Sequence, residues 1–225
     1  MYKGEYIAPT LTVDSIIFQL INGQLSVLLI QRTQDPFNGS WALPGGYNAA
    51  GETTTEAMTR ILERKTGLVA SDLKLVEQLY TFDTIARDPR GHAVSVTYMG
   101  LGLDLNLEPS STAQNPQFFP VSDLPSLAYD HADIIKYAHK RLQSKLTYTN
   151  AVYALLPPLF TLSHLQASYE AILGRLLDKR NFRKKFLSLD LIEPTDRQLQ
   201  EGAHRPARLY QFKQQSLQAL ERNFD

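Results

Sequence analysis

The 225-residue sequence predicts an α+β protein of two domains, a mixed α/β domain over residues 1–148 and a smaller domain of helices and a β-hairpin over residues 149–225. Strand-like runs surround an amphipathic helix in the first part, whereas two short helices precede two strands in the second. Residues 1–150 hold 12 Lys+Arg and 15 Asp+Glu, a net charge of −3, and the rest hold 11 and 8, a net of +3. This asymmetry, hidden in a total of zero, indicates a polyanionic partner for the basic part.

The composition excludes several classes of protein. Hydrophobic residues make up 43% of the chain and charged residues 20%, which is typical of a globular protein. The absence of cysteine excludes a disulfide framework and a thiolate metal cluster, and it fits a reducing cytoplasm. No apolar run reaches the roughly 18–20 residues of a membrane span, and Met1–Glu5 lacks the apolar core of a signal peptide. We therefore expect a cytoplasmic protein with no membrane partner.

The first domain is expected to open with two strands, Leu11–Leu20 and Leu25–Arg32. Asn22-Gly23 between them favours a tight hairpin, because both residues adopt positive φ at low cost. The glycine-rich segment Gly39–Gly46 predicts a loop. These features place the start of the sheet before the first helix.

A helix is expected after this loop, because Thr53-Thr54-Thr55-Glu56 has the form of a capping box. Ala57 and Ile61 then recur at helical spacing, and Gly67 is suited to end the helix. Two further strands and a closing helix are expected at Leu73–Thr84, Ala93–Leu105 and Asp130–Leu146.

One motif is recognisable around the first helix. Its residues keep a fixed spacing over 23 positions: Gly46, Glu52, Arg60, Leu62 and Gly67-Leu68, preceded by Trp41–Gly46. This part of the chain resembles the Nudix family of diphosphate hydrolases. The resemblance implies an α/β/α sandwich with a mixed sheet over roughly Tyr6 to Leu146.

The metal-binding positions of the motif are altered. In the family, glutamates follow the arginine directly and again three and four residues later, so their carboxylates share one helix face and bind divalent cations. Here Ile61, Arg64 and Lys65 occupy those positions. Glu52 remains, but Glu63 projects about 100° away around the helix. We therefore predict a scaffold with no metal site and no catalytic residues, which is not an enzyme.

The pocket of such a scaffold is expected to hold a nucleoside diphosphate intact. Arg87 and Arg90 are suited to phosphate oxygens, and the alternative is a turn in which they pair with Asp88. Trp41 is a candidate for stacking on adenine, and the alternative is burial in the core. The candidate effector-binding residues are Arg32, Trp41, Gly45, Gly46, Arg60, Arg87, Asp88 and Arg90.

The second domain is predicted to be a winged helix-turn-helix. Apolar residues recur at helical spacing from Leu162 to Leu173, Gly174 favours a turn, and Leu177–Leu187 forms a second helix with an apolar stripe and a basic face. Leu191–Thr195 and Ala207–Phe212 are expected strands, with a basic wing between them at Gln200–Pro206.

A basic helix after a tight turn is typical of a helix that enters the major groove of DNA. The alternative is a small packing domain with a polar outer face, which does not explain the basic helix and wing. The candidate DNA-binding residues are His164, Lys179, Arg180, Asn181, Arg183, Lys184, His204 and Arg205.

Both parts together resemble a narrower group. The altered Nudix box, Thr81–Asp83, Arg87–Arg90, Leu177–Phe186 and Arg205–Tyr210 are similar to the Nudix-related transcriptional regulators of NAD metabolism, the NrtR group. The resemblance spans about Leu11 to Phe212. It implies a bacterial repressor that binds a palindromic operator as a homodimer. It also implies that ADP-ribose or a related NAD-pathway nucleotide, rather than a cofactor, occupies the pocket and releases the DNA.

Two alternatives remain open. The first is an active hydrolase of ADP-ribose or a similar diphosphate, which would use Glu52, Glu56 and Glu63 and carry the basic domain as an accessory. The second is a nucleotide-sensing adaptor that binds protein instead of DNA.

Overall fold

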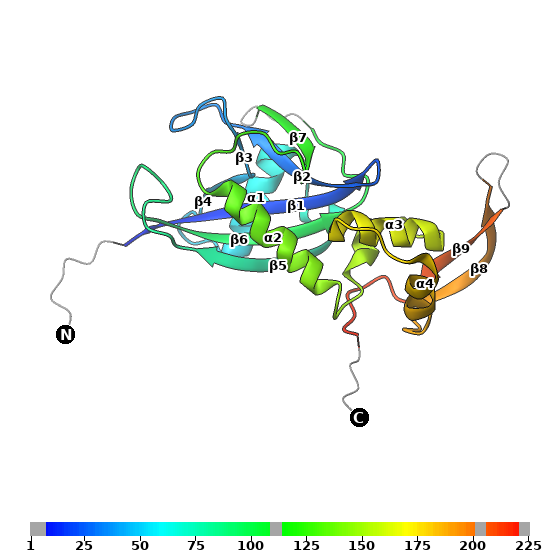
Figure 1. Cartoon of the computed structure of the whole chain (residues 1–225). Helices are drawn as coiled ribbons and strands as arrows, with labels where there is room; N and C mark the ends of the chain where they lie inside the picture. Colours follow the sequence, from blue (N-terminus) through cyan, green and yellow to red (C-terminus); the bar gives the residue numbers. More distant parts are fainter. Residues whose placement is uncertain (1–7, 109–113, 201–205, 221–225) are drawn as a thin grey trace.

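A seven-stranded mixed sheet forms the N-terminal domain of the computed structural model, which describes residues 8–108, 114–200 and 206–220 (Figure 1). The main order is β3-β2-β1-β6-β5, with β4 beside β1 and β7 beside β2. The long central strands β1 and β6 run parallel, and the other pairs are antiparallel. The long strands are β1 Thr10–Ile21, β2 Gln24–Gln31, β5 Leu73–Phe82 and β6 Ala93–Gly102.

Helices cover both faces of this sheet. Ile16 and Phe18 of β1 pack into the cluster that contains α2 (His131–Lys145), whereas Val13 and Ile17 pack into the cluster that contains α1 (Thr54–Thr66). Alternate residues of a strand point to opposite faces, so one strand supplies both layers. Figure 1 shows α1 behind the sheet and α2 in front of it, which is the predicted α/β/α sandwich.

The local signals of the sequence are found in the structure. Asn22 and Gly23 have φ of 50° and 75° at the β1–β2 turn. Thr53 caps α1, its hydroxyl accepts from the amide of Glu56, and the Glu56 carboxylate accepts from the amide of Thr53. Gly67 ends the helix in the left-handed conformation. The helix boundaries therefore follow from capping chemistry.

The prediction of a loop over Gly39–Gly46 is wrong in part, because the segment contains the short strand β3 (Trp41–Ala42) and the start of β4 (Gly45–Tyr47). Both are too short for an alternating pattern. β4 also pairs with β1, more than 30 residues earlier in the sequence, whereas β3 pairs with the end of β2. Strand β7 (Gln114–Pro120) was also not predicted. It contains two prolines, which edge strands tolerate because one side needs no amide donors.

The C-terminal domain has the predicted helix, turn, helix and hairpin. After a 3₁₀ turn, Ala151–Leu155, it contains α3 Leu162–Leu173, α4 Lys179–Leu187, β8 Ile192–Leu199 and β9 Ala207–Phe212. Gly174 ends α3 in the left-handed conformation, and Asp178 caps α4, so α4 starts two residues after the predicted Leu177. Among the described helices, none is long and apolar enough to cross a membrane.

The two domains share one hydrophobic core. A single buried cluster includes Leu101 of the sheet, Leu142 of α2, the residues 151–156, and Phe160 and Phe212 of the C-terminal domain. Lys74 on β5 donates from Nζ to the carbonyl of Leu156 at 3.0 Å. Packing is thus continuous across the predicted boundary at residues 148/149, which itself stays a prediction.

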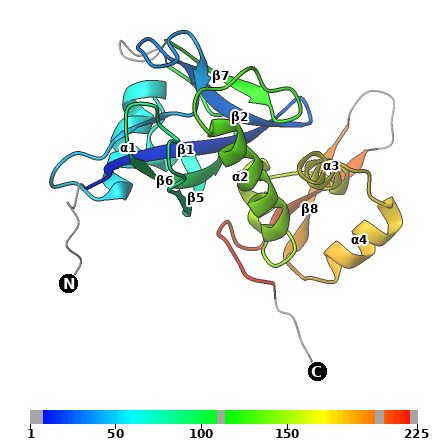
Figure 2. The same ribbon diagram turned by 60° about the vertical axis from the view of Figure 1, so that its left-hand side comes forward.

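The junction is also held by the segment 214–220, which runs back from β9 to the end of α2 (Figure 2). The amide of Leu220 donates to the carbonyl of Tyr148 at 2.8 Å, and the amide of Asn150 donates to the carbonyl of Gln218 at 3.1 Å. The Asn150 side chain adds a bond to Ser216 O at 3.0 Å. Hydrogen bonds therefore connect the residues that precede the C-terminal domain in the sequence with those that follow β9.

Because the core is shared, Phe160→Ala is expected to destabilise the whole chain by about 3–5 kcal/mol. Phe160 is fully buried, and its ring centre lies 5.2 Å from that of Phe212. Thermal unfolding followed by circular dichroism should show one transition at a lower Tm. Leu176→Ala is the control, since Leu176 is 87% exposed. A variant in which only one of two separate transitions moves would contradict the shared core.

Candidate functional site

A cavity of about 620 Å³ lies on the N-terminal domain, between β1, the end of β2, α1, the loop at residues 83–92 and the start of α2. Its volume is in the range of small-molecule sites. It brings together seven of the eight predicted effector-binding residues: Arg32, Gly45, Gly46, Arg60, Arg87, Asp88 and Arg90. Whether they contact an effector stays a prediction, but their proximity across some 60 residues of sequence follows from the fold.

Asp14 on β1 is a buried carboxylate in the wall of this cavity. Ser95 Oγ donates to Asp14 Oδ2 at 2.6 Å, and Arg87 Nη2 lies 3.6 Å from the same oxygen. His131 Nε2 lies 3.8 Å from Oδ1. Gly45 is required here, because a Cβ at that position would lie 1.8 Å from Asp14 Oδ1.

Arg87 forms a buried ion pair that sequence reasoning did not identify. Its Nε and Nη2 donate to the two carboxylate oxygens of Asp130 at 2.9 and 2.7 Å, and its side chain is only 5% exposed. Asp130 is the residue that precedes α2. The alternative of an Arg87–Asp88 pair is corrected, because Arg87 pairs with the start of α2 and not within its own turn.

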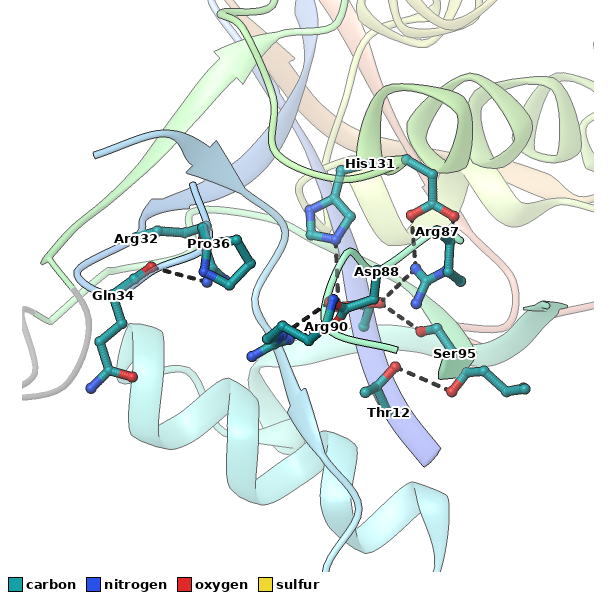
Figure 3. Close-up of polar contacts among 12 residues, drawn as sticks. Thr12, Arg32, Gln34, Pro36, Arg87, Asp88, Arg90, Ser95 and His131 are labelled. Atoms are coloured by element: carbon teal, nitrogen blue, oxygen red, sulfur yellow. Dashed lines mark hydrogen bonds and ion pairs between the residues drawn. The ribbon is translucent and has the colours of Figure 1, made fainter. Parts of the chain in front are cut away.

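Two more of the predicted effector-binding arginines, Arg60 and Arg90, are also paired with carboxylates. Arg90 donates from Nε and Nη2 to Asp88 at 3.0 and 2.7 Å, which is the predicted alternative of an ion-paired turn (Figure 3). Arg60 forms an ion pair with Glu52 and donates to Tyr47 O at 3.0 Å. The hydrogen bond from Arg60 lowers the pKa of Glu52.

Arg32 and Lys65 donate their hydrogen bonds to main-chain carbonyls and not to carboxylates. Arg32 donates from Nε to Pro36 O at 2.8 Å and from Nη2 to Gln34 O at 3.1 Å (Figure 3). Lys65 donates from Nζ to the carbonyl of Gly45. Burial lowers the pKa of Lys65, and the charge of Asp14 opposes this shift. Sequence reasoning did not include Lys65 among the site residues, although its place in the motif was the signal.

Tyrosines, not Trp41, are the aromatic side chains of the cavity. Trp41 packs edge-on against Phe119, with ring centres 4.6 Å apart, and lies outside the cavity lining. This favours its alternative as a core residue. Tyr47 and Tyr129 line the cavity, and Arg32 lies 4.9 Å from the ring centre of Tyr129. Sequence reasoning missed Tyr129 because it lies far from the motif.

The residues at the motif's metal positions do not fit a divalent cation. Ile61 is buried in the core beneath Gly46, and Lys65 adds a positive charge where an oxygen ligand would be needed. Glu52 already accepts from Arg60 and from the amide of Ala49 at 2.5 Å. Across residues 8–108, 114–200 and 206–220, no three His, Asp or Glu side chains gather as a metal site. Magnesium requires such oxygen donors.

Helix α4 carries the second candidate site. Phe182 and Phe186 lie 5.7 Å apart on its inner face and pack against Tyr169 of α3. The residues on its outer face are exposed and mostly basic: Lys179, Arg180, Asn181, Lys184 and Lys185. This amphipathic division is the predicted one, and Lys185 is an addition to the predicted set.

The other four predicted DNA-binding residues do not lie on the exposed face of α4. Arg183 is half-buried and donates from Nη2 to Ser163 Oγ at 3.1 Å, so it also joins α4 to the start of α3. His164 is exposed in the first turn of α3. His204 and Arg205 of the expected wing lie outside the described residues.

The two domains have counterparts in known proteins. Residues 10–139 match the NUDIX domain, and residues 152–212 match the NrtR DNA-binding winged helix domain. The ADPR responsive transcriptional repressor NtrR of Acinetobacter baylyi is 37% identical over 99% of this chain and 88% of its own length. The chain belongs to the NrtR family.

Solved structures of the family agree with this assignment. Shewanella oneidensis NrtR complexed with a 27mer DNA is 34% identical, with a TM-score of 0.78 over 90% of this chain and 93% of that one. The NUDIX domain of the same protein, complexed with ADP ribose, has 35% identity and a TM-score of 0.56 over 61% of this chain and 90% of its own.

An enzyme is also among the relatives of the N-terminal domain. An ADP-ribose pyrophosphatase of Methanocaldococcus jannaschii is 37% identical over 58% of this chain and 73% of its length.

The buried His131 makes stability depend on pH. Its Nδ1 accepts from the amide of Leu43 at 2.9 Å, and burial lowers its pKa from 6.5 although Asp14 opposes the shift. The unfolded chain therefore takes up a proton first as the pH falls below 6.5, and stability decreases by up to about 1.4 kcal/mol per pH unit. Urea unfolding between pH 7.5 and 5.5 measures this slope.

His131→Asn should flatten that slope, because asparagine does not titrate but still offers an acceptor to the amide of Leu43. His92→Asn is the matched control, since His92 is exposed. Equal slopes in the parent and in His131→Asn would show that another group carries the pH dependence.

Proposed function

We propose that this chain is a transcriptional repressor of NAD metabolism genes that releases its operator when ADP-ribose or a related NAD-pathway nucleotide enters the cavity. The main observation in support of this proposal is that a cavity lined by cations and an exposed basic helix lie in one chain and share one hydrophobic core. The family relatives in complex with DNA and with ADP ribose support both halves of the proposal. Such a regulator acts in the bacterial cytoplasm, at the nucleoid when bound to DNA.

In this proposal α4 lies in the major groove of double-stranded DNA. Its exposed Lys179, Arg180 and Asn181 reach phosphates and base edges, while its phenylalanines stay in the domain core. One chain offers one such helix, so a palindromic operator requires a homodimer. Its two helices would lie about 34–36 Å apart, or a multiple of this distance.

Helix α2 supplies a physical route between the two sites. Its start is held by the Arg87–Asp130 pair in the cavity wall. Towards its other end, His139 Nε2 lies 2.7 Å from the carbonyl of Ile172, and Gln143 donates to the same oxygen at 3.0 Å. Ile172 precedes the turn into α4. In Figure 2, α2 lies beside α3, so in this proposal an effector that shifts Arg87 displaces α3 through α2.

The proposal includes the absence of hydrolysis. The donor set around Glu52 and Lys65 supports it, whereas the relationship to an ADP-ribose pyrophosphatase keeps a hydrolase as the alternative. Incubation of the protein with ADP-ribose and Mg²⁺ or Mn²⁺, followed by chromatography, separates the two. We expect no AMP above the level without protein. Turnover that disappears in Glu52→Gln would instead favour the hydrolase.

Arg180→Ala is expected to weaken DNA binding and to reduce the slope of log affinity against log salt by about one unit, if Arg180 neutralises one phosphate. Fluorescence anisotropy with an operator fragment at several salt concentrations measures both. Lys136→Ala on the exposed side of α2 is the charge-matched control and should bind as the parent does. If both variants bind equally well, α4 is not the DNA-reading helix. Binding of a protein partner in a salt-insensitive manner would favour the adaptor.

Operator DNA should weaken ADP-ribose binding by the same factor by which ADP-ribose weakens DNA binding, typically about 5–150-fold. The double variant His139→Leu, Gln143→Leu should bind both ligands but reduce this factor towards one, because it removes both bonds to Ile172 O. Lys140→Ala, on the same helix and exposed, is the control. The factor comes from ADP-ribose affinities with and without operator. An unchanged factor in the double variant would exclude α2 as the route.

A further inference from the structure

Five of the cations that line the cavity fall into two groups. Arg60, Arg87 and Arg90 each form an ion pair with a carboxylate, which cancels most of their charge towards a ligand. The hydrogen bonds of Arg32 and Lys65 instead end on main-chain carbonyls. A carbonyl satisfies a donor but carries no net charge. Of these five cations, Arg32 and Lys65 therefore offer the most positive charge to an anion in the cavity. Arg32 is one of the residues predicted from the sequence, whereas Lys65 is not.

Lys65 is built into the cavity wall. It lies one helical turn after Ile61, and residues four apart share a helix face. Ile61 packs under Gly46, so Lys65 is directed to the adjacent Gly45, whose carbonyl accepts from its ammonium group. The Asp14 carboxylate is next to the same glycine, because a Cβ on Gly45 would lie 1.8 Å from Asp14 Oδ1. An ammonium group that is partly removed from water and held by a neutral oxygen gains strongly from a bound anion.

Desolvation supports this role. Burial lowers the pKa of Lys65, and the positive charges of Arg32 and Arg64 lower it further, with Asp14 as the opposing charge. The charged form is thus held at a cost in the free protein, and a bound anion would relieve it.

We propose that Lys65, together with Arg32, binds the diphosphate of the effector directly, in the place where a hydrolase of this fold would use a divalent cation. The inference rests on the proposed function, because it assumes that the cavity is the effector site. An ammonium group attracts phosphate oxygens as a metal does, but it has no coordination position for a water molecule and does not acidify one. A ligand bound in this way stays intact, which is what a sensor requires.

Titration calorimetry of the full-length protein with ADP-ribose tests the proposal. The parent should bind with the same affinity in EDTA and in Mg²⁺. Lys65→Met should lower the affinity about 10–100-fold, since a charge-assisted hydrogen bond to phosphate is lost. Lys65→Arg keeps the charge and should retain a substantial part of the affinity. Lys136→Met, on the exposed side of α2, controls for the loss of one positive charge and should leave the affinity unchanged.

The thermal unfolding and operator affinity of Lys65→Met without ADP-ribose show whether it is folded; if it is not, Lys65→Gln is measured in its place. Lys65 variants that bind ADP-ribose like the parent, or a parent that binds only with Mg²⁺, would overturn the role of Lys65. Release of DNA by ADP-ribose in the parent would then still support the proposed function. A parent that binds no ADP-ribose in either buffer would overturn both.

Discussion

The buried carboxylate of Asp14 is the constraint on which the cavity depends. A charge inside a protein must be paired or hydrogen-bonded, because removing it from water is costly. Ser95 on β6 and Arg87 in the loop at residues 83–92 meet this need, and His131 of α2 packs beside the carboxylate, with Nε2 3.8 Å from Oδ1. Arg87 in turn requires Asp130. One acidic side chain on the central strand thereby fixes the loop and the start of a helix around the same space.

Helix α2 connects this cavity to the C-terminal domain. α2 has one end in the polar network of the cavity and the other against the carbonyl of Ile172, and its apolar face belongs to the core that both domains share. A close-packed core moves between discrete arrangements and does not deform smoothly. In the proposed switch, a small displacement at Asp130 is therefore passed on as a movement of the whole helix.

The sequence was informative where the interactions are local. The capping box at Thr53, the left-handed Gly67 and Gly174, and the amphipathic α4 are readable because their partners lie within a few residues. The Nudix box was recognisable for the same reason. Three features could not be predicted, because each joins segments 40 or more residues apart. They are the ion pair of Arg87 with Asp130, the packing of Trp41 outside the cavity that Tyr129 lines, and strand β7. Only tertiary packing decides them.

The segment 214–220, which closes on Tyr148 and Asn150, bears on how the DNA-binding domain can be handled as a module. A chimaera that exchanges this domain between regulators by cutting after β9 would leave Tyr148 and Asn150 without these hydrogen-bond partners. The transferable unit is therefore the winged helix together with its returning segment. The junction between the two domains is formed by residues before and after the winged helix. A chimaera with a new N-terminal domain must therefore keep the residues on both sides.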